Sequence, residues 1–297
     1  MKVATMPHPA GISDAPADRR KIRISPTGKA GARTALVRTA LGCVMALAAM
    51  ATVPQAVASA GDGALRIGVT HIPPPPGPSD IRLYTPEGFD VLLARKIAAA
   101  LDRPLELVEV DANEDDALAA GAVDVVLARR GDNDAQPEKT RIIRSGFRSA
   151  ATVAMRTDTT IHGWDDLAGR TVCISRGNAE GVRLAEAYHA NIRLTEAPAR
   201  GLVQVRTGGC DAAIHDEVLL RPLFGETGWQ KFSATLPPLE ETELVALLAT
   251  DQPRLSDEAV STLARTVTSP NWPGLGRKWA ENVAFEVYLD QDAPDCH

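Results

Sequence analysis

The sequence has few aromatic residues and lacks the short motifs of several enzyme classes. Phe, Trp and Tyr make up 4% of its 297 residues, so a binding box built from many aromatic rings is not expected. No Gly-x-Ser-x-Gly, Cys-x-x-Cys or His-x-x-x-His pattern occurs, and the histidines are scattered. These absences argue against a nucleophile-elbow hydrolase, a dithiol redox site and a helix-borne zinc site. We therefore expect no catalytic residues, no metal and no cofactor.

The first sixty residues have the composition of an export signal. A basic leader precedes the apolar run ALVRTALGCVMALAAMATV, and small residues lie at positions −3 and −1 of a cut after Ala60. This three-part layout is typical of a secretory signal. The run after Arg38 is about fifteen residues long, short of the roughly 20 that span a bilayer, which disfavours a transmembrane anchor. The sequence predicts a secreted, periplasmic protein, and Arg19-Arg20 leaves twin-arginine export open.

Without residues 1–60 the chain is acidic. The leader holds eight of the 32 Lys and Arg and two of the 38 Asp and Glu, so 24 basic and 36 acidic side chains remain, with a net charge of −12. An acidic surface argues against nucleic acid or an anionic membrane as a partner. It does not constrain the charge of a buried pocket.

Hydrophobic periodicity repeats one plan twice after residue 64. Each pass reads strand, helix, strand, helix, strand, and the strands are apolar enough for burial on both faces. Two such units in succession predict an α/β protein with two doubly wound parallel-sheet lobes. The expected elements are 65–70, 88–102, 105–110, a helix ending at Gly121, and 122–128 in the first unit, and 170–175, 178–190, 191–195, 199–208 and 210–215 in the second.

Two β-rich segments, 149–157 and 243–250, follow the two units, and helical patterns close the chain. We expect these segments to run side by side as a two-strand hinge, with a ligand cleft between the lobes. In open parallel sheets, ligands bind beyond the carboxyl ends of the strands, beside helix N-termini. The predicted boundaries are 63–151 with 249–297 for lobe 1, and 152–248 for lobe 2.

The ordered set of motifs resembles one family, the periplasmic solute-binding proteins of ABC importers, in the class that binds polar amino acids. The resemblance covers residues 65 to about 283 and implies the type II periplasmic-binding fold. Each motif alone is weak, but their order is specific. The matching pieces are GFDVLLARKIAAAL, AGAVDVVLA with PEKTRIIRS, IHGWDDLAGRTVCISRGNAE, GGCDAAIHDEVLL and SPNWPGLGRKWAENV.

The resemblance implies a ligand-binding turn and a carboxylate. The turn Ser175-Arg176-Gly177-Asn178 matches the family's turn whose backbone N–H groups hold the ligand's α-carboxylate. A helix N-terminus offers unpaired donors and a positive dipole end, in agreement. The alternative is an ordinary helix capped by Asn178. Asp216 matches the carboxylate that holds the α-ammonium group, although a carboxylate there can equally cap a helix.

The chain departs from the family at its arginine clamp. Lys139 stands where the family has an arginine, and a lysine cannot make the planar bidentate contact with a carboxylate. Arg129 and Arg130 directly follow a strand, so either one could supply the missing cation, or both could be a solvated loop pair. Tyr84 is the one aromatic residue in the long proline-rich loop where the family places a stacking ring.

Cys173 and Cys210 lie on strands that the doubly wound order makes adjacent. In an exported protein such a pair indicates a disulfide, and some relatives carry cysteines at both places. The alternative is two buried free thiols. Cys296 is left without a predicted partner.

These observations predict a monomeric binding protein that captures a small polar solute, an amino acid or a derivative, for an ABC permease in the inner membrane. Two alternatives remain open. One is an enzyme similar to cyclohexadienyl dehydratases, which the family resemblance associates with this fold, with Glu180 near the position of the acid. The other is an accessory or sensory binding protein without a transporter.

Overall fold

The computed structural model describes residues 63–74, 83–110, 114–251 and 254–290. The predicted leader, Cys43 and Cys296 lie outside these residues. Among the helices of the described ranges, none is long and apolar enough to cross a membrane. The elements are β1 Leu65–Val69, α1 Asp90–Ala100, β2 Leu105–Glu109, α2 Glu114–Ala119, β3 Val125–Gly131, β4 Thr140–Met155, η1 Trp164–Leu167, β5 Thr171–Ser175, α3 Ala179–Ala187, β6 Asn191–Thr195, α4 Pro198–Thr207, β7 Ala212–Asp216, α5 Glu217–Phe224, η2 Thr227–Phe232, β8 Leu239–Ala249, α6 Asp257–Thr268 and α7 Trp272–Asp290.

The strands form one eight-stranded sheet in the order β2-β1-β3-β8-β4-β7-β5-β6. β1 pairs in parallel with β2 and β3, and β5 pairs in parallel with β6 and β7. We call β1, β2 and β3 with helices α1 and α2 the first unit, and β5, β6 and β7 with α3 and α4 the second unit. Between them, β8 and β4 are antiparallel to each other and to their neighbours.

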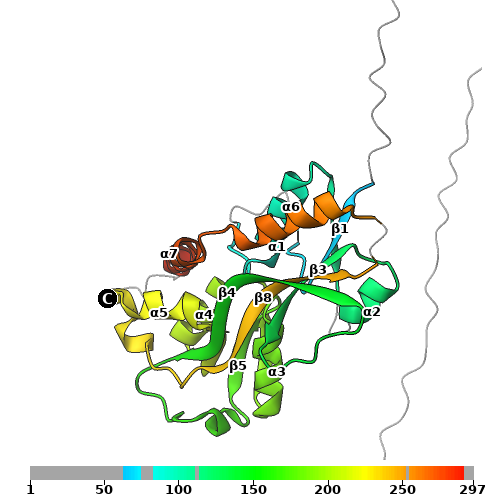
Figure 1. Cartoon of the computed structure of the whole chain (residues 1–297). Helices are drawn as coiled ribbons and strands as arrows, with labels where there is room; N and C mark the ends of the chain where they lie inside the picture. Colours follow the sequence, from blue (N-terminus) through cyan, green and yellow to red (C-terminus); the bar gives the residue numbers. More distant parts are fainter. Residues whose placement is uncertain (1–62, 75–82, 111–113, 252–253, 291–297) are drawn as a thin grey trace, which may run out of the picture. The chain divides into compact units, whose positions relative to one another are not determined.

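The two long strands β4 and β8 lie side by side and link the units (Figure 1). The prediction that segments 149–157 and 243–250 run side by side is wrong, because these two segments pair with different partners. β8 pairs along Thr242–Ala249 with the first part of β4, Thr140–Ser149, whereas Ala151–Met155 of β4 pairs with β7. The reason is that β4 has 16 residues: its first part pairs with β8, which pairs in turn with β3 of the first unit, and its last part pairs with β7 of the second.

Helices cover both faces of each parallel group. In the first unit, Leu127 faces the same core as Leu93 of α1, and its neighbour Val126 packs with Leu118 of α2. In the second unit, Cys173 lies in one core with Leu202 of α4, and Ile174 lies in another with Leu184 of α3. Because side chains alternate along a strand, this split places helices on opposite faces. The predicted α/β class with two doubly wound parallel groups is confirmed.

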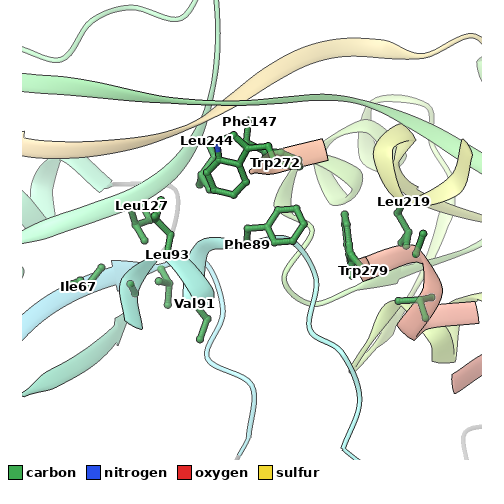
Figure 2. Close-up of a cluster of buried hydrophobic side chains, with 14 of the residues drawn as sticks. Ile67, Phe89, Val91, Leu93, Leu127, Phe147, Leu219, Leu244, Trp272 and Trp279 are labelled. Atoms are coloured by element: carbon green, nitrogen blue, oxygen red, sulfur yellow. The ribbon is translucent and has the colours of Figure 1, made fainter. Parts of the chain in front are cut away.

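Four of the scarce aromatic side chains form one buried cluster (Figure 2). The ring centroid of Phe89 lies 4.9 Å from that of Phe147, 5.7 Å from that of Trp272 and 5.2 Å from that of Trp279. The Trp272 indole donates to the backbone oxygen of Ser145 at 2.7 Å. We call these four rings the aromatic cluster. It joins the start of α1, the middle of β4 and α7.

The C-terminal helices contact both units. α6 packs against α1, and α7 packs against α4 and α5 (Figure 1). The Tyr84 hydroxyl donates to Asp290 at 2.6 Å, which also ties α7 to the loop before α1. The division into lobes at the predicted boundaries stays a prediction, because α7 makes contacts on both sides of it.

Candidate functional site

Two strands of the second unit end where a loop of the first unit meets them. β5 ends at Ser175 and β7 ends at Asp216. Their adjacent ends follow from the parallel pairing of β5 with β7, which places both carboxyl termini at one edge of the sheet. The loop before α1 brings Glu87 onto this edge.

The Glu87 carboxylate bonds to the second unit through one oxygen. The Ser175 hydroxyl donates to Oε2 of Glu87, and Nδ1 of His215 lies 3.2 Å from the same oxygen. The side chain of Glu87 is 5% exposed and that of His215 is fully buried. Gly177 permits this approach, since a Cβ atom there would lie 3.0 Å from Cβ of Glu87. The two units are therefore in close contact at this point.

Arg129, near the end of β3, is held from four sides. Its Nε donates to Oγ1 of Thr242 at 2.9 Å, and its Nη2 donates to the backbone oxygen of Ser149 at 3.1 Å and to Asp216 at 3.3 Å. The guanidinium carbon lies 5.0 Å from the ring centroid of Phe147. Such contacts fix the direction of the guanidinium group. The cation of the first unit and the carboxylate of the second thus form an ion pair across the junction.

Burial changes the proton affinity of two acids near this junction. It raises the pKa of Asp216, which the charge of Arg129 opposes and that of Glu87 reinforces. It also raises the pKa of Asp90, from 3.8 to about 6, against the hydrogen bond from the Val91 backbone. Perturbed carboxyl groups of this kind gather at functional sites, although structural ion-pair networks also produce them.

Several buried polar atoms at the junction have no hydrogen-bond partner within the described part of the chain. They are Oε1 of Glu87, Nε2 of His215 and Nε2 of His71. Buried polar groups are normally paired, and leaving one unpaired costs free energy. The junction therefore has hydrogen-bonding capacity that these contacts do not use.

The turn after β5 caps a helix. Asn178 is the N-cap of α3: its Oδ1 accepts from the Gly181 backbone at 2.8 Å, and its Nδ2 donates to the Ile214 backbone oxygen at 3.0 Å. Arg176 points to the surface, where it pairs with Glu196 at 2.8 Å. Asn178 therefore caps the helix, as the alternative interpretation of the turn predicts, whereas Ser175 and Gly177 face Glu87.

Of the other two predicted cations, Arg130 points to the opposite face of the sheet from Arg129, and Lys139 lies apart from the junction. Arg130 neighbours Arg129 on β3, and successive strand residues point to opposite faces. Lys139 is exposed and immediately precedes β4. Ile142 lies three residues after Lys139 and pairs with Leu247 of β8. The other neighbour of Leu247 is Val126, at the start of β3. Lys139 therefore lies at the opposite edge of the first unit from Arg129, and the structure does not bring it to the site.

Glu180, the acid considered for a dehydratase, forms an ion pair with Arg183 at 2.6 Å, one turn along α3. Sequence reasoning did not identify Glu87, because the length of the loop before α1 left its direction open. It also assigned no role to His215, which precedes Asp216 on β7. The structure shows how both can be near the site: His215 contacts Glu87 while Asp216 contacts Arg129.

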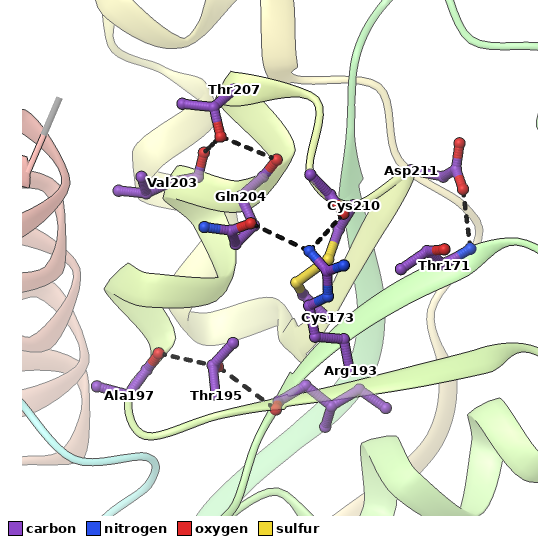
Figure 3. The surroundings of a disulfide bond; sticks show 12 residues. Thr171, Cys173, Arg193, Thr195, Ala197, Val203, Gln204, Thr207, Cys210 and Asp211 are labelled. Carbon is purple, nitrogen blue, oxygen red and sulfur yellow. Dashed lines mark hydrogen bonds between the residues drawn. A yellow bond between two sulfur atoms is a disulfide. The ribbon is translucent and has the colours of Figure 1, made fainter. Parts of the chain in front are cut away.

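The predicted disulfide is present. Cys173 and Cys210 are bonded with a Cα–Cα distance of 5.9 Å, inside the usual 4.4–6.8 Å range. Figure 3 shows the bond beneath α4, beside Arg193, whose Nη1 donates to Gln204 at 3.2 Å and to the Gly209 backbone oxygen at 2.8 Å. Because Cys173 lies two residues before Ser175, the disulfide braces one of the strands that end at the site.

A cavity of about 1720 Å³ adjoins the junction. Pro86 and Gly88, on either side of Glu87, form part of its wall, together with Arg200 of α4 and Trp279 of α7. The described residues that line it include none of the eight predicted from the sequence. Of the predicted positions, Ser175 and Gly177 are covered by Glu87, and open space lies beyond the loop that carries it.

Comparison with known proteins identifies similar folds. No protein-family model matches the chain, and no curated protein matches it. Solved structures that match include an amino acid ABC transporter substrate-binding protein, AbpA of Streptococcus pneumoniae, bound to L-arginine (16% identity, 76% of this chain and 96% of that chain covered, TM-score 0.48). Another is the GluR0 ligand-binding core with L-glutamate, with 16% identity, 73% of this chain and 96% of that chain covered, and a TM-score of 0.47. A third is AncCDT-1, described as an ancestral amino acid-binding protein and a precursor of cyclohexadienyl dehydratase, with 20% identity, 74% of this chain and 94% of that chain covered, and a TM-score of 0.47. The likeness to these solved structures is one of fold alone.

Proposed function

We propose that this protein is an extracytoplasmic solute-binding protein that captures a small polar solute, an amino acid or a derivative with a carboxylate, for an ABC importer. The site is the junction of the two units, and the predicted lobes would open and close around it by motion about β4 and β8. In this proposal the protein acts as a monomer in the periplasm and delivers the solute to a membrane permease.

The observation that carries the proposal is the buried polar junction. Ser175 and His215 from the second unit contact Glu87 from the first, and Asp216 pairs with Arg129 across the same junction. A hydroxyl and a guanidinium donate to a carboxylate, and Asp216 accepts from an amine. The site therefore offers complementary partners for both ends of an amino acid.

A thermal-shift screen against amino acids, opines, amines and organic acids tests the proposal. A ligand that binds only the folded protein raises the free energy of unfolding by about 2.7 kcal/mol at a hundredfold excess over its Kd. We expect compounds with a carboxylate to raise the unfolding midpoint. If only compounds without a carboxylate raise it, the proposed solute class is wrong.

A further inference from the structure

Glu87 occupies the position that the proposed function assigns to the carboxylate of a solute. Its Oε2 accepts from the Ser175 hydroxyl and lies 3.2 Å from Nδ1 of His215, while its Cβ lies over Gly177 at the turn into α3. A carboxylate at the N-terminus of a helix is also favoured by the helix dipole. The side chain comes from the opposite unit, so the contact holds the two units together.

The contact between Glu87 and the second unit leaves polar atoms unpaired, and this allows another carboxylate to replace that of Glu87. Oε1 of Glu87 and Nε2 of His215 are both buried without a hydrogen-bond partner in the described residues. A buried carboxylate with half of its acceptors unused pays a desolvation cost that is only partly offset. A free carboxylate that brings further polar groups can satisfy more of these atoms than Glu87 does.

We propose that Glu87 is an internal ligand of the cleft. Its carboxylate stands in for that of a solute, holds the two units closed when no solute is present, and must be displaced before a solute carboxylate can bind. Because Glu87 is part of the same chain, its effective concentration at the site is high. It thereby sets a threshold affinity that a solute has to exceed. The displacement step rests on the proposed function, whereas the closure does not.

The closure is tested by small-angle X-ray scattering of the purified protein without solute. We compare wild type with Glu87→Ala and with Glu196→Ala, a control that removes a carboxylate paired with Arg176 inside the second unit. Circular dichroism verifies that each variant is folded. We expect a larger radius of gyration for Glu87→Ala than for wild type and the control. Equal radii for all three proteins would overturn the proposal.

Chemical rescue tests whether a carboxylate is the group that matters. Sodium acetate in excess should bind in the space left by Glu87→Ala and return its radius of gyration toward the wild-type value, while sodium chloride at matched ionic strength should not. Wild type should respond to neither salt. A variant that stays expanded in acetate, or closes equally in chloride, would contradict the role of Glu87 as a carboxylate stand-in.

A third measurement separates this proposal from the proposed function. For a carboxylate compound that stabilises wild type in the thermal-shift screen, removal of the competing side chain should lower the Kd of Glu87→Ala about tenfold. An unchanged or higher Kd would overturn the displacement step. If no compound binds either protein, the proposed function fails, and the scattering and acetate results still decide whether Glu87 closes the cleft.

Discussion

Buried acids are the unusual residues of this protein. Glu87, Asp90 and Asp216 all lie near the junction of the two units, and burial raises the pKa of Asp90 and Asp216. Arg129 partly neutralises this group through its ion pair with Asp216. Acids in low-dielectric surroundings are costly to ionise, so a protein that keeps several of them gives up stability there. We expect that cost to be measurable at single positions.

Asp90→Asn should stabilise the protein at neutral pH. The folded pKa of Asp90, about 6, exceeds the ordinary aspartate pKa of 3.8. The folded state therefore holds the proton more firmly than the unfolded state, and the contribution of Asp90 to stability is full below 3.8 and is lost as pH rises through 6. Asn keeps an oxygen that can accept from the Val91 backbone.

Urea unfolding across this pH interval measures the effect. Each pKa unit corresponds to about 1.4 kcal/mol. We therefore expect the free energy of unfolding of Asp90→Asn, relative to that of wild type, to rise by about 1–3 kcal/mol from acidic to neutral pH. Asp257→Asn is the control, because Asp257 is an exposed residue in the first turn of α6. A pH dependence of Asp90→Asn equal to that of wild type would contradict the assignment.

The positions of single residues were predictable where these residues terminate strands. Ser175 and Asp216 end β5 and β7, and the periodicity of these strands fixed their ends. Glu87 could not be found in this way, because it lies in a loop with a proline-rich start, and the path of such a loop depends on what it packs against. A motif match gives a position in the sequence and not an edge of the sheet, so it could not predict that Lys139 lies at the opposite edge of the first unit from Arg129.

Among the elements, β4 and the parts that surround it hold the molecule together. The aromatic cluster packs where β4 has a register shift between Arg144 and Arg148, next to Gly146 with φ +81°. Glu243 of β8 is nearly buried there and accepts from the Gly146 backbone at 2.8 Å and from Arg144 at 2.9 Å. The irregular part of the long strand is thus supported by both packing and hydrogen bonds.

Phe147→Ala should strongly destabilise the protein. Phe147 is 2% exposed and packs edge-on against Phe89. Removing a buried Phe side chain costs about 3–5 kcal/mol through lost transfer energy and the cavity left behind. Chemical denaturation of the variant measures this loss, with Phe285→Ala as a control, because Phe285 is 61% exposed. A loss below that of the control would show that the cluster is loosely packed.

Loss of the disulfide should destabilise the folded state. The bond spans a sequence separation of 37 residues, and closing a loop of that length is worth about 3–4 kcal/mol on the chain-entropy model. We expect the double variant Cys173→Ala and Cys210→Ala to lose a comparable free energy of unfolding. Adding a reductant should lower the stability of wild type and leave the double variant unaffected. A double variant as stable as oxidised wild type would refute this account.

The elements themselves were largely predictable, because helical and strand periodicity is strong in both units. The order of the parallel strands followed from the repeated plan. The extent of β4 did not, since the polar residues between Thr140 and Ser149 do not show the alternation of a strand with one buried face. They are accommodated because charged partners such as Glu243 and Asp132 lie beside them.

For the whole molecule, the central claim is that the two units bind one solute at their junction. The sheet supports this claim because β4 and β8 link the units while the strand ends of β3, β5 and β7 approach one another. Sequence resemblance predicted this architecture. It could not predict that the junction is occupied by Glu87, because that contact depends on how closely the units approach.

Isothermal titration with the compound that stabilises wild type most in the thermal-shift screen tests this claim most directly. Arg129→Ala and Asp216→Ala should each raise the Kd at least tenfold, about 1.4 kcal/mol or more, with the fold verified by circular dichroism. Lys139→Ala, at the opposite edge of the first unit, should leave the Kd unchanged. If Lys139→Ala weakens binding while Arg129→Ala and Asp216→Ala do not, the solute binds elsewhere and the account of the site is wrong.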